Sequence, residues 1–468
     1  MHVFTVDSHS INNFNTFVPN FYYYNEVVKN EYLERGGKYI TLGQYSVVSD
    51  GEHSAIPRNS EGGIRYLYGR NIREGIIDFD PISDDSYITE NAYNSFTRCH
   101  ISEGDVLIAI YGTVGKSAVY RKAYIGLAGI PRHISNISLK SNSPISAEYL
   151  TAFFRSKYGK AQINSYMTGN IQQLFSLKSI REYSVPILPQ KIMDEITGVE
   201  KEAVVCEIKA REKIDRAIEL FYEGMKFDPR NINEDKVFTV SNAELFGSNI
   251  WSVSMYNNTF QKIEDNMEEK TGISRLSELV DMMHGDEVGS DAYISYEDRN
   301  VEDIAFIRTS DIVNNEVDLY PDYYVSLENM DGVKQEIKKD DIIFTKDGKI
   351  GAVGMIVESD KVILSSGIEI LRIKPEAMKN GVSAQYIFTA LLVPEVGYYG
   401  AKRRAVVAST IPHLRENRLG EIAIPIVEKQ MIDKITILIK EAFDLKNKRK
   451  ILLKSNENII ENYFLEEA

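Results

Sequence analysis

The sequence predicts an α+β protein built from two homologous domains and two long helices, with the helices pairing as an antiparallel coiled coil of pseudo-twofold symmetry. Three observations carry this prediction. The chain contains a long internal repeat, each copy is rich in short apolar segments typical of strands, and each copy ends in a helical segment with heptad spacing. The repeat period exceeds 230 residues. It is therefore a whole-domain duplication, since the repeats of solenoid proteins are about 20 to 50 residues long.

Five segments recur in the same order and anchor the repeat. The best of them is Gly104–Lys116, which returns as Asp340–Ala352 at an offset of 236 residues. The others pair Leu42 and Gly51 with Leu276 and Gly285, Ile64–Ile72 with Ile304–Ile312, Ser146–Tyr149 with Ser383–Tyr386, and Val185–Ile187 with Ile424–Ile426. Two similar domains on one chain usually serve two similar binding events, and a duplicated scaffold without a ligand is the alternative.

The predicted elements also recur. The predicted buried strands are Gly104–Ile110 and Asp341–Phe344, each continued after a glycine-containing turn by Lys116–Tyr120 and Ala352–Val357. Ser146–Arg155 and Ser383–Leu392 are predicted helices, because each opens on a serine that can cap the first turn.

A long charged helix is predicted after each copy, and it follows a proline-containing segment. The resulting boundaries are residues 1–189 and 228–427 for the two domains and residues 190–227 and 428–468 for the two helices. Spacings that alternate between three and four residues predict coiled-coil seams. The seam positions are Ile192, Ile196, Val199, Ala203, Cys206, Ala210, Lys213, Ala217 and Leu220, then Leu438, Ala442, Leu445, Arg449, Leu452, Asn456, Ile459 and Tyr463. Packing of each helix on its own domain is the alternative.

Composition restricts the function classes. The chain has 468 residues and a formal net charge of −14, which argues against a protein that simply coats nucleic acid. Any DNA contact must come from local basic clusters. Cys99 and Cys206 stand in unrelated contexts, so neither a disulfide nor a zinc site is predicted. The sequence has no run of 18 apolar residues, and a cytoplasmic protein without membrane contact is predicted.

Catalytic motifs are not recognised. The segment Gly112–Ser117 ends like a phosphate-binding loop, but the motif requires a glycine where Ile110 stands. No group of residues supplies a nucleophile, a base and an orienting group together. The sequence therefore predicts neither an enzyme nor a metal site.

Polar, aromatic and basic residues gather in corresponding loops of the two copies. Arg, Asn and Gln side chains match base edges in the major groove, and Lys, Ser and Thr suit phosphates. The candidate DNA-binding residues of the first copy are His53, Arg58, Arg70, Asn71, Arg73, Tyr111, Thr113, Lys116, Arg132, His133, Asn170, Gln172 and Gln173. Those of the second copy are His284, Arg308, Thr309, Ser310, Lys346, Lys349, Lys402, Arg403, Arg404 and His413.

The run Lys402-Arg403-Arg404 is the strongest of these signals, because residues 271–427 carry a net charge of −9. It predicts a phosphate contact. Each candidate taken alone has an ordinary surface or loop-capping role as its alternative.

The order of these elements resembles the DNA specificity subunits of type I restriction-modification systems. The resemblance rests on Asp50–His53, on the strand and loop of Gly104–Lys116, on Gly169–Leu174, and on Val185–Ile192 leading into a long helix, and it recurs in the second half. It implies two target-recognition domains that each read one half of a split DNA site, with the helices fixing the gap between the halves.

The resemblance also implies partners. Two DNA methyltransferase subunits would dock on the helices, a motor-nuclease subunit would join for cleavage, and S-adenosylmethionine would bind the methyltransferase and not this chain. A restriction-modification or related phage-defence complex is expected, in which this chain recognises double-stranded DNA without catalysis. A protein-interaction scaffold with duplicated binding domains is the alternative.

Overall fold

A computed structural model describes residues 5–6, 22, 24, 28–59, 62–78, 86–167, 174–232, 237–247, 253–296, 298–300, 302–329, 332–408 and 411–466. The chain divides into two compact units. Unit 1 combines residues 1–205 with 449–468, and unit 2 is the continuous stretch 206–448. Each unit thus joins one copy of the repeat to parts of both long helices, and the predicted domain boundaries stay predictions.

Unit 1 is built around a four-stranded antiparallel sheet in the order β2-β10-β7-β8, with a two-stranded sheet β1-β11 and a three-stranded sheet β6-β3-β9 in the same unit. Its strands are β1 (Tyr39–Thr41), β2 (Ser46–Asp50), β3 (Ile64–Tyr66), β4 (Ile72–Arg73), β5 (Ile76–Ile77), β6 (Tyr87–Ile88), β7 (Val106–Ala109), β8 (Ser117–Val119), β9 (Ala128–Gly129), β10 (Ile134–Leu139) and β11 (Ser184–Pro186). Its shorter helices are α3 (Lys29–Glu34), α4 (Leu42–Tyr45), α5 (Glu90–Ser95), α6 (Lys122–Ile125), α7 (Ala147–Arg155), α8 (Lys157–Tyr166) and α9 (Leu177–Glu182).

Unit 2 repeats the topology of the main sheet strand for strand. Its main sheet has the order β13-β22-β19-β20, a second four-stranded sheet has the order β14-β18-β15-β21, and the two-stranded sheets are β12-β25, β16-β17 and β23-β24. Its strands are β12 (Ile273–Arg275), β13 (Val280–His284), β14 (Ile294–Ser295), β15 (Ile304–Ile307), β16 (Ile312–Val313), β17 (Glu316–Val317), β18 (Tyr323–Val325), β19 (Ile342–Thr345), β20 (Val353–Met355), β21 (Val362–Leu364), β22 (Ile368–Ile373), β23 (Val406–Ala408), β24 (Ile411–His413) and β25 (Ala423–Pro425). Its shorter helices are α11 (Asn242–Gly247), α12 (Asn258–Thr271), α13 (Leu276–Leu279), α14 (Pro375–Lys379), α15 (Ala384–Leu392), α16 (Gly397–Arg404) and α17 (Glu416–Leu419).

The predicted duplication is therefore confirmed in topology, and it extends to single hydrogen bonds. In unit 1 the Ser146 hydroxyl caps α7 by accepting from Tyr149 N at 3.0 Å, and it also lies 2.8 Å from Thr197 Oγ1 on the long helix. In unit 2 the equivalent Ser383 caps α15 and lies 2.6 Å from Thr436 Oγ1. The same polar contact thus fixes each domain to the long helix that follows it.

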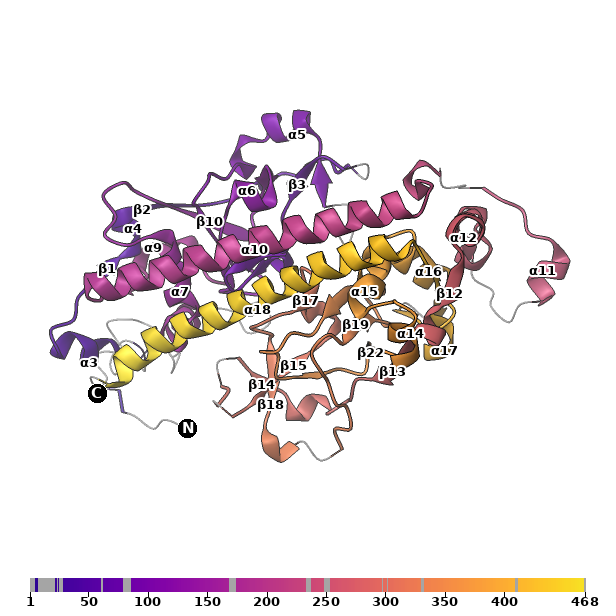
Figure 1. The fold of residues 1–468 in the computed structure, drawn as a ribbon. Helices are drawn as coiled ribbons and strands as arrows, with labels where there is room; N and C mark the ends of the chain where they lie inside the picture. The colour runs from indigo at the N-terminus through magenta and orange to yellow at the C-terminus, as the bar shows by residue number, and fades with distance from the viewer. Residues whose placement is uncertain are drawn as a thin grey trace. The chain divides into compact units, whose positions relative to one another are not determined.

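The two long helices are α10 (Gln190–Gly224) and α18 (Lys429–Glu466), which Figure 1 shows side by side. In unit 1, Asn456 Nδ2 donates to Ile196 O at 3.0 Å. In unit 2, Lys213 Nζ forms an ion pair with Glu441 Oε2 at 2.5 Å. From the first contact to the second, the residue number increases on α10 and decreases on α18. The two helices are therefore antiparallel, as predicted. The pseudo-twofold symmetry stays a prediction.

Buried polar and charged side chains lie in or beside both helix seams. In unit 2 the ammonium of Lys446 lies 3.0 Å from Glu207 Oε1 and 3.2 Å from Glu316 Oε1, and all three side chains are at most 4% exposed. In unit 1 Asn456 also donates to Glu200, whose carboxylate pairs with the buried guanidinium of Arg155. Such contacts fix the helix register, because a slipped register would leave buried charges without partners.

Cys99 and Cys206 are both buried, and neither forms a disulfide. Among the described helices, none combines the length and the apolar content needed to cross a membrane.

Candidate nucleic-acid interface

In both repeats, the turn after the third strand of the main sheet meets a segment from much later in the chain. In unit 1, Tyr111 follows β7 and forms an isolated antiparallel bridge with Leu174. In unit 2, Asp347 follows β19 and forms the same bridge with His413. The structure thus brings together, within each repeat, loops that sequence analysis singled out as candidate binding loops.

An aromatic and basic surface covers these loops in the first repeat. The guanidinium of Arg58 lies 4.1 Å from the ring centroid of Tyr66 and 5.4 Å from that of Tyr68. Arg70 also stacks on this group, 4.7 Å from the Tyr68 ring. Both arginines are exposed. Cation–π contacts of this kind orient a guanidinium while it keeps its charge.

The loop between β9 and β10 adds Arg132 and His133 to the same surface. The rings of His133 and Tyr111 meet edge to face at 5.5 Å, and Thr113 Oγ1 donates to Gly69 O at 3.1 Å. Burial and the nearby Arg132 lower the pKa of His133. Its imidazole is therefore neutral at neutral pH and can both donate and accept a hydrogen bond.

His53 is fixed by an acidic partner. Its Nε2 donates to Asp50 Oδ2 at 2.8 Å, and Arg98 pairs with the other carboxylate oxygen. Burial works to raise the pKa of Asp50, but Arg98 and His53 outweigh it, so the pKa lies below its usual value. Half of the His53 side chain remains exposed.

The second repeat has a cavity of about 610 Å³ at the equivalent place. It gathers the predicted residues His284, Lys346 and His413, together with Asp347. The remaining lining residues are Val406, Leu414, Arg415, Glu416 and Asn417. Asp347 and His413 are joined side chain to side chain as well as by their backbone bridge, since His413 Nδ1 donates to Asp347 Oδ1 at 2.7 Å.

A charged network forms one wall of this cavity. Lys346 Nζ lies 2.7 Å from Glu369 Oε2 and 2.7 Å from His284 Nδ1, while His284 Nε2 lies 3.1 Å from Glu416 Oε2. Ligand atoms of the histidine and the two glutamates lie within 4.8 Å of one another, a spacing that a metal ion could use. The ammonium of Lys346 already supplies positive charge at this point, so the chain neutralises Glu369 with its own residue.

Other candidate side chains of the second repeat contact residues of the same unit. Arg308 pairs with Asp322 at 2.8 Å and with Asp311 at 3.4 Å, and its guanidinium stacks on Tyr323. Lys349 Nζ donates to Ile312 O at 3.4 Å, and Ser310 Oγ lies 3.3 Å from Asp311 Oδ1. Thr309 and Ser310 lie in the turn after β15, with Ser310 exposed.

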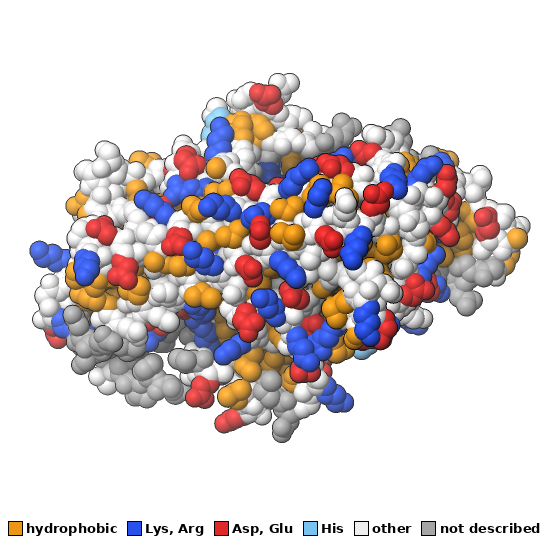
Figure 2. All heavy atoms as spheres, in the orientation of Figure 1, with side chains coloured by type: hydrophobic (Ala, Val, Ile, Leu, Met, Phe, Trp, Pro, Cys, Tyr) orange, Lys and Arg blue, Asp and Glu red, His pale blue; other side chains and the backbone are white. Residues whose placement is uncertain are grey.

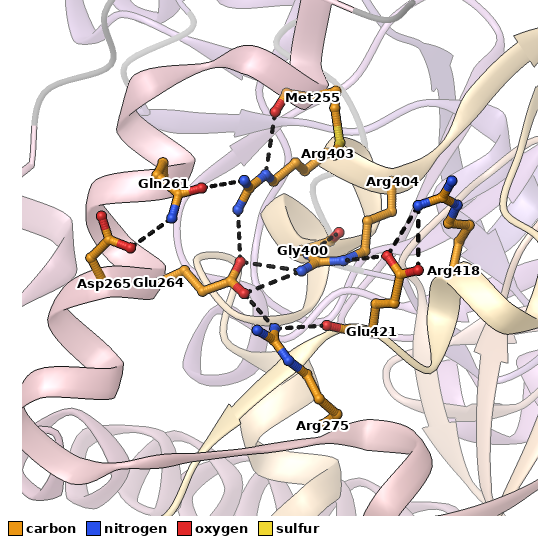
Figure 3. A network of polar contacts seen from close by, with 10 residues as sticks. All are labelled: Met255, Gln261, Glu264, Asp265, Arg275, Gly400, Arg403, Arg404, Arg418 and Glu421. Carbon is orange, nitrogen blue, oxygen red and sulfur yellow. Dashed lines mark hydrogen bonds and ion pairs between the residues drawn. The ribbon is translucent and has the colours of Figure 1, made fainter. Parts of the chain in front are cut away.

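The predicted phosphate contact at Lys402–Arg404 is wrong for its two arginines. Arg403 and Arg404 both point inward to the carboxylate of Glu264 on α12, at 2.8 and 3.2 Å, and Arg275 pairs with the same carboxylate (Figure 3). Arg403 also donates to Met255 O and to Gln261. The three guanidinium groups therefore hold the segment 253–271 against the rest of unit 2.

Glu264 is the centre of this arginine cluster. Burial works to raise its pKa, but Arg404, Arg275 and Arg403 together outweigh burial, and the pKa lies below its usual value. The side chains of Arg403 and Arg404 are only 14% and 7% exposed. Lys402 lies outside the cluster, with its ammonium 5.9 Å from the Phe260 ring.

Two further candidates of the first repeat must also be corrected. Arg73 and Lys116 are buried, with 6% and 7% exposure, so neither side chain offers a surface to DNA. Asn71 has a local role, because its amide caps a turn by accepting from Tyr68 N and donating to Asp78 O. Asn170, Gln172 and Gln173 lie outside the described residues.

Sequence reasoning missed Glu369 and Glu416. Glu369 is fully buried in β22 and has Ile368 and Ile370 as neighbours in the strand. A carboxylate inside such an apolar strand needs a cationic partner, and that signal could have found the pair with Lys346. Nothing in the sequence marks Glu416, whose proximity to His284 depends on the tertiary fold.

A family model described as "Type I restriction modification DNA specificity domain" matches residues 268–455. The S subunit of a type I restriction-modification system from M. genitalium has 14% identity and a TM-score of 0.33, with 92% of this chain and 95% of that chain covered. The HsdS subunit from Thermoanaerobacter tengcongensis has 12% identity and a TM-score of 0.28, with 92% and 96% covered. A chain from a structure of the assembly and conformational transition of the type I R-M system has 14% identity and a TM-score of 0.27, with 92% and 97% covered. No curated protein matches significantly.

Proposed function

Residues 268–455 match a type I restriction modification DNA specificity domain, and from this premise we propose that the whole chain is the DNA-recognition subunit of a type I restriction-modification or related defence complex. The single observation that carries the proposal to the first half is the shared topology. The main sheets β2-β10-β7-β8 and β13-β22-β19-β20 have the same strand order, so the first repeat is a second domain of the same kind.

In this proposal each repeat reads one half of a bipartite site. The support is that each repeat assembles its own polar loop surface, around Tyr111 in unit 1 and around Asp347 in unit 2. The exposed residues Arg58, Arg132 and His133 suit phosphates and base edges. The chain itself supplies recognition, and methylation and cleavage belong to partner subunits, with S-adenosylmethionine in the methyltransferase.

The long helices are the proposed docking surface for two methyltransferase subunits. Their exposed faces carry basic and acidic side chains in mixture, as Figure 2 shows for one face. Three large apolar side chains, Val205, Ile437 and Ile451, are also 46%, 57% and 55% exposed on the helices. Mixed charge with exposed apolar anchors suits a protein partner better than it suits DNA phosphates.

The test is to express the chain with the methyltransferase encoded beside it and to map methylated bases in the host DNA by long-read sequencing. The expected result is one bipartite motif with a fixed gap. A methylome that is identical with and without the chain would overturn the proposal. It would also favour the scaffold alternative if the chain still captured the methyltransferase.

A second variant tests whether the helices set the gap. Inserting one heptad after Ala210 in α10 and one after Leu445 in α18 keeps the seam spacing and lengthens each helix by about 10 Å. Both half-sequences should persist while the gap grows by about three base pairs, at about 3.4 Å per base pair. The insertion separates Lys446 from Glu316, so expression of the folded chain is verified first. An unchanged gap would contradict the proposal that the helices set the gap.

A further inference from the structure

We propose that Asp347 is a specificity-determining residue of the second repeat, which reads the amino group of an adenine or cytosine, and that His413 positions it. This inference rests on the proposed function. It deepens that function by assigning one side chain to one base pair in the half-site that the second repeat reads.

The first argument is the preorganisation of Asp347. Its backbone pairs with His413, and neighbouring bonds run from Gly348 N to Pro412 O at 3.2 Å and from Leu414 N to Lys346 O at 2.9 Å. The carboxylate is then oriented by the 2.7 Å bond from His413 Nδ1 to Oδ1. A side chain fixed by both its backbone and a partner loses little conformational freedom on binding.

The second argument is that a hydrogen-bond acceptor remains. Among the residues that the structure describes, His413 is the one that bonds the Asp347 carboxylate, and it uses Oδ1. The side chains of Asp347 and His413 are 35% and 47% exposed at the cavity. A carboxylate oxygen accepts only, so it matches the N4 amino group of cytosine or the N6 amino group of adenine and repels the keto oxygens of guanine and thymine.

The third argument comes from the other cavity walls. Lys346 is held by the buried Glu369, so its charge is engaged inside the protein and does not neutralise Asp347. Val406 and Leu414 add apolar surface to the lining. A cavity of about 610 Å³ that combines polar and apolar side chains and contains the oriented carboxylate of Asp347 can receive the edge of a base.

At the position equivalent to Asp347, the first repeat has Tyr111. The bridge that Asp347 makes with His413 is made there by Tyr111 with Leu174. A tyrosine hydroxyl both donates and accepts, and leucine does neither. Asp347 therefore distinguishes the two half-sites chemically, although the backbone around it is duplicated.

The test uses the full chain in complex with its methyltransferase and compares methylated motifs. In Asp347→Asn, one base position in one half of the motif should lose its preference for an amino-bearing base by about 10-fold or more, since a good base contact gives about 1 to 3 kcal/mol of discrimination. His413→Ala should relax the same position. His413→Asn keeps a donor near Nδ1 and should restore much of the preference.

Two controls accompany these variants. Glu376→Gln makes the same carboxylate-to-amide change at an exposed position on α14, and it should leave the motif as it is. The unaltered half of the motif reports folding, because only a folded chain can read it. If Asp347→Asn ends methylation altogether, binding of the complex to duplexes that differ at one base pair each gives the discrimination directly.

The outcomes separate the two proposals. A wild-type complex without a bipartite motif refutes the proposed function. A bipartite motif that Asp347→Asn leaves unchanged, or changes equally in both halves, refutes only the role of Asp347. Relaxation in Asp347→Asn without any effect of His413→Ala refutes the positioning role of His413.

Discussion

The two repeats share the order of their strands but use their positive charge differently. In the first, the side chains of Arg58 and Arg132 are exposed. In the second, Arg403 and Arg404 are directed into the domain by Glu264, and the turn equivalent to that of Tyr111 presents Asp347. Duplication of a backbone therefore does not duplicate the charge of its surface, and a basic run in the sequence turns inward where an internal carboxylate pairs with it.

The largest effect is expected from removing that carboxylate. Glu264→Gln leaves three guanidinium groups facing one another, and we expect the free energy of unfolding to fall by about 2 to 3 kcal/mol. Breaking a fully buried ion pair costs about 3 to 5 kcal/mol, and the loss here is smaller because Arg275 is partly exposed. Urea unfolding followed by circular dichroism measures this. Glu268→Gln, at an exposed position of the same helix, is the matched control.

The same variant has a pH signature. Because the folded pKa of Glu264 lies below its usual value, its stabilising contribution is present above the ordinary carboxyl range and is lost as pH falls through the folded pKa. Glu264→Gln should therefore flatten the acid limb of the stability curve. A variant as stable as the wild type at neutral pH would show that the arginine cluster is not structural.

An intermediate effect is expected on DNA binding. The double variant Arg58→Ala/Arg132→Ala should weaken binding by the assembled complex and lower the slope of log affinity against log salt by about 1 to 2, since each phosphate that is no longer neutralised lowers it by roughly 0.9. Arg403→Ala should leave this slope unchanged in the fraction that folds. Fluorescence anisotropy across a salt series measures both slopes. A lower slope for Arg403→Ala and an unchanged slope for Arg58→Ala/Arg132→Ala would contradict the difference between the repeats.

The smallest effect tests the part that the repeats share. Ser146→Ala and Ser383→Ala each remove a helix cap and a bond to the long helix, and each should cost about 1 kcal/mol. The two losses should be equal within error. Ser176→Ala, which removes the cap of the short helix α9, is the reference. Unequal losses in urea unfolding would mean that the equivalent bonds differ in strength.

The sequence predicted the framework well because local patterns determine it. The strand predicted at Gly104–Ile110 is β7, the strand predicted at Asp341–Phe344 is β19, and the serine-capped helices are α7 and α15. Apolar runs, glycine turns and serine caps act over a few residues, so they can be read without tertiary information. The first helix seam is likewise confirmed, with Ala203, Ala210 and Ala217 all buried.

The site could be predicted only in part. The sequence indicated which loops carry polar residues, but a side chain's partner can lie far along the chain. Arg403 meets Glu264 139 residues earlier, and Lys346 meets Glu369 23 residues later. Whether an arginine faces solvent or a carboxylate is decided by such distant contacts. The phosphate contact predicted for Arg403 and Arg404 failed for this reason.

The buried ion pair between Glu207 and Lys446 has a consequence for the ancestry of the chain. Each residue lies 17 positions after the start of its helix (207 − 190 and 446 − 429), so the two occupy the same position of the duplication and contact each other. A dimer of two identical half-length chains with this helix register would place glutamate against glutamate or lysine against lysine at that point, without water to separate the charges. Once the two copies are fused in one chain, this position can be glutamate in one copy and lysine in the other. The ion pair therefore favours pairing of α10 with α18 and opposes pairing of either half with an identical half.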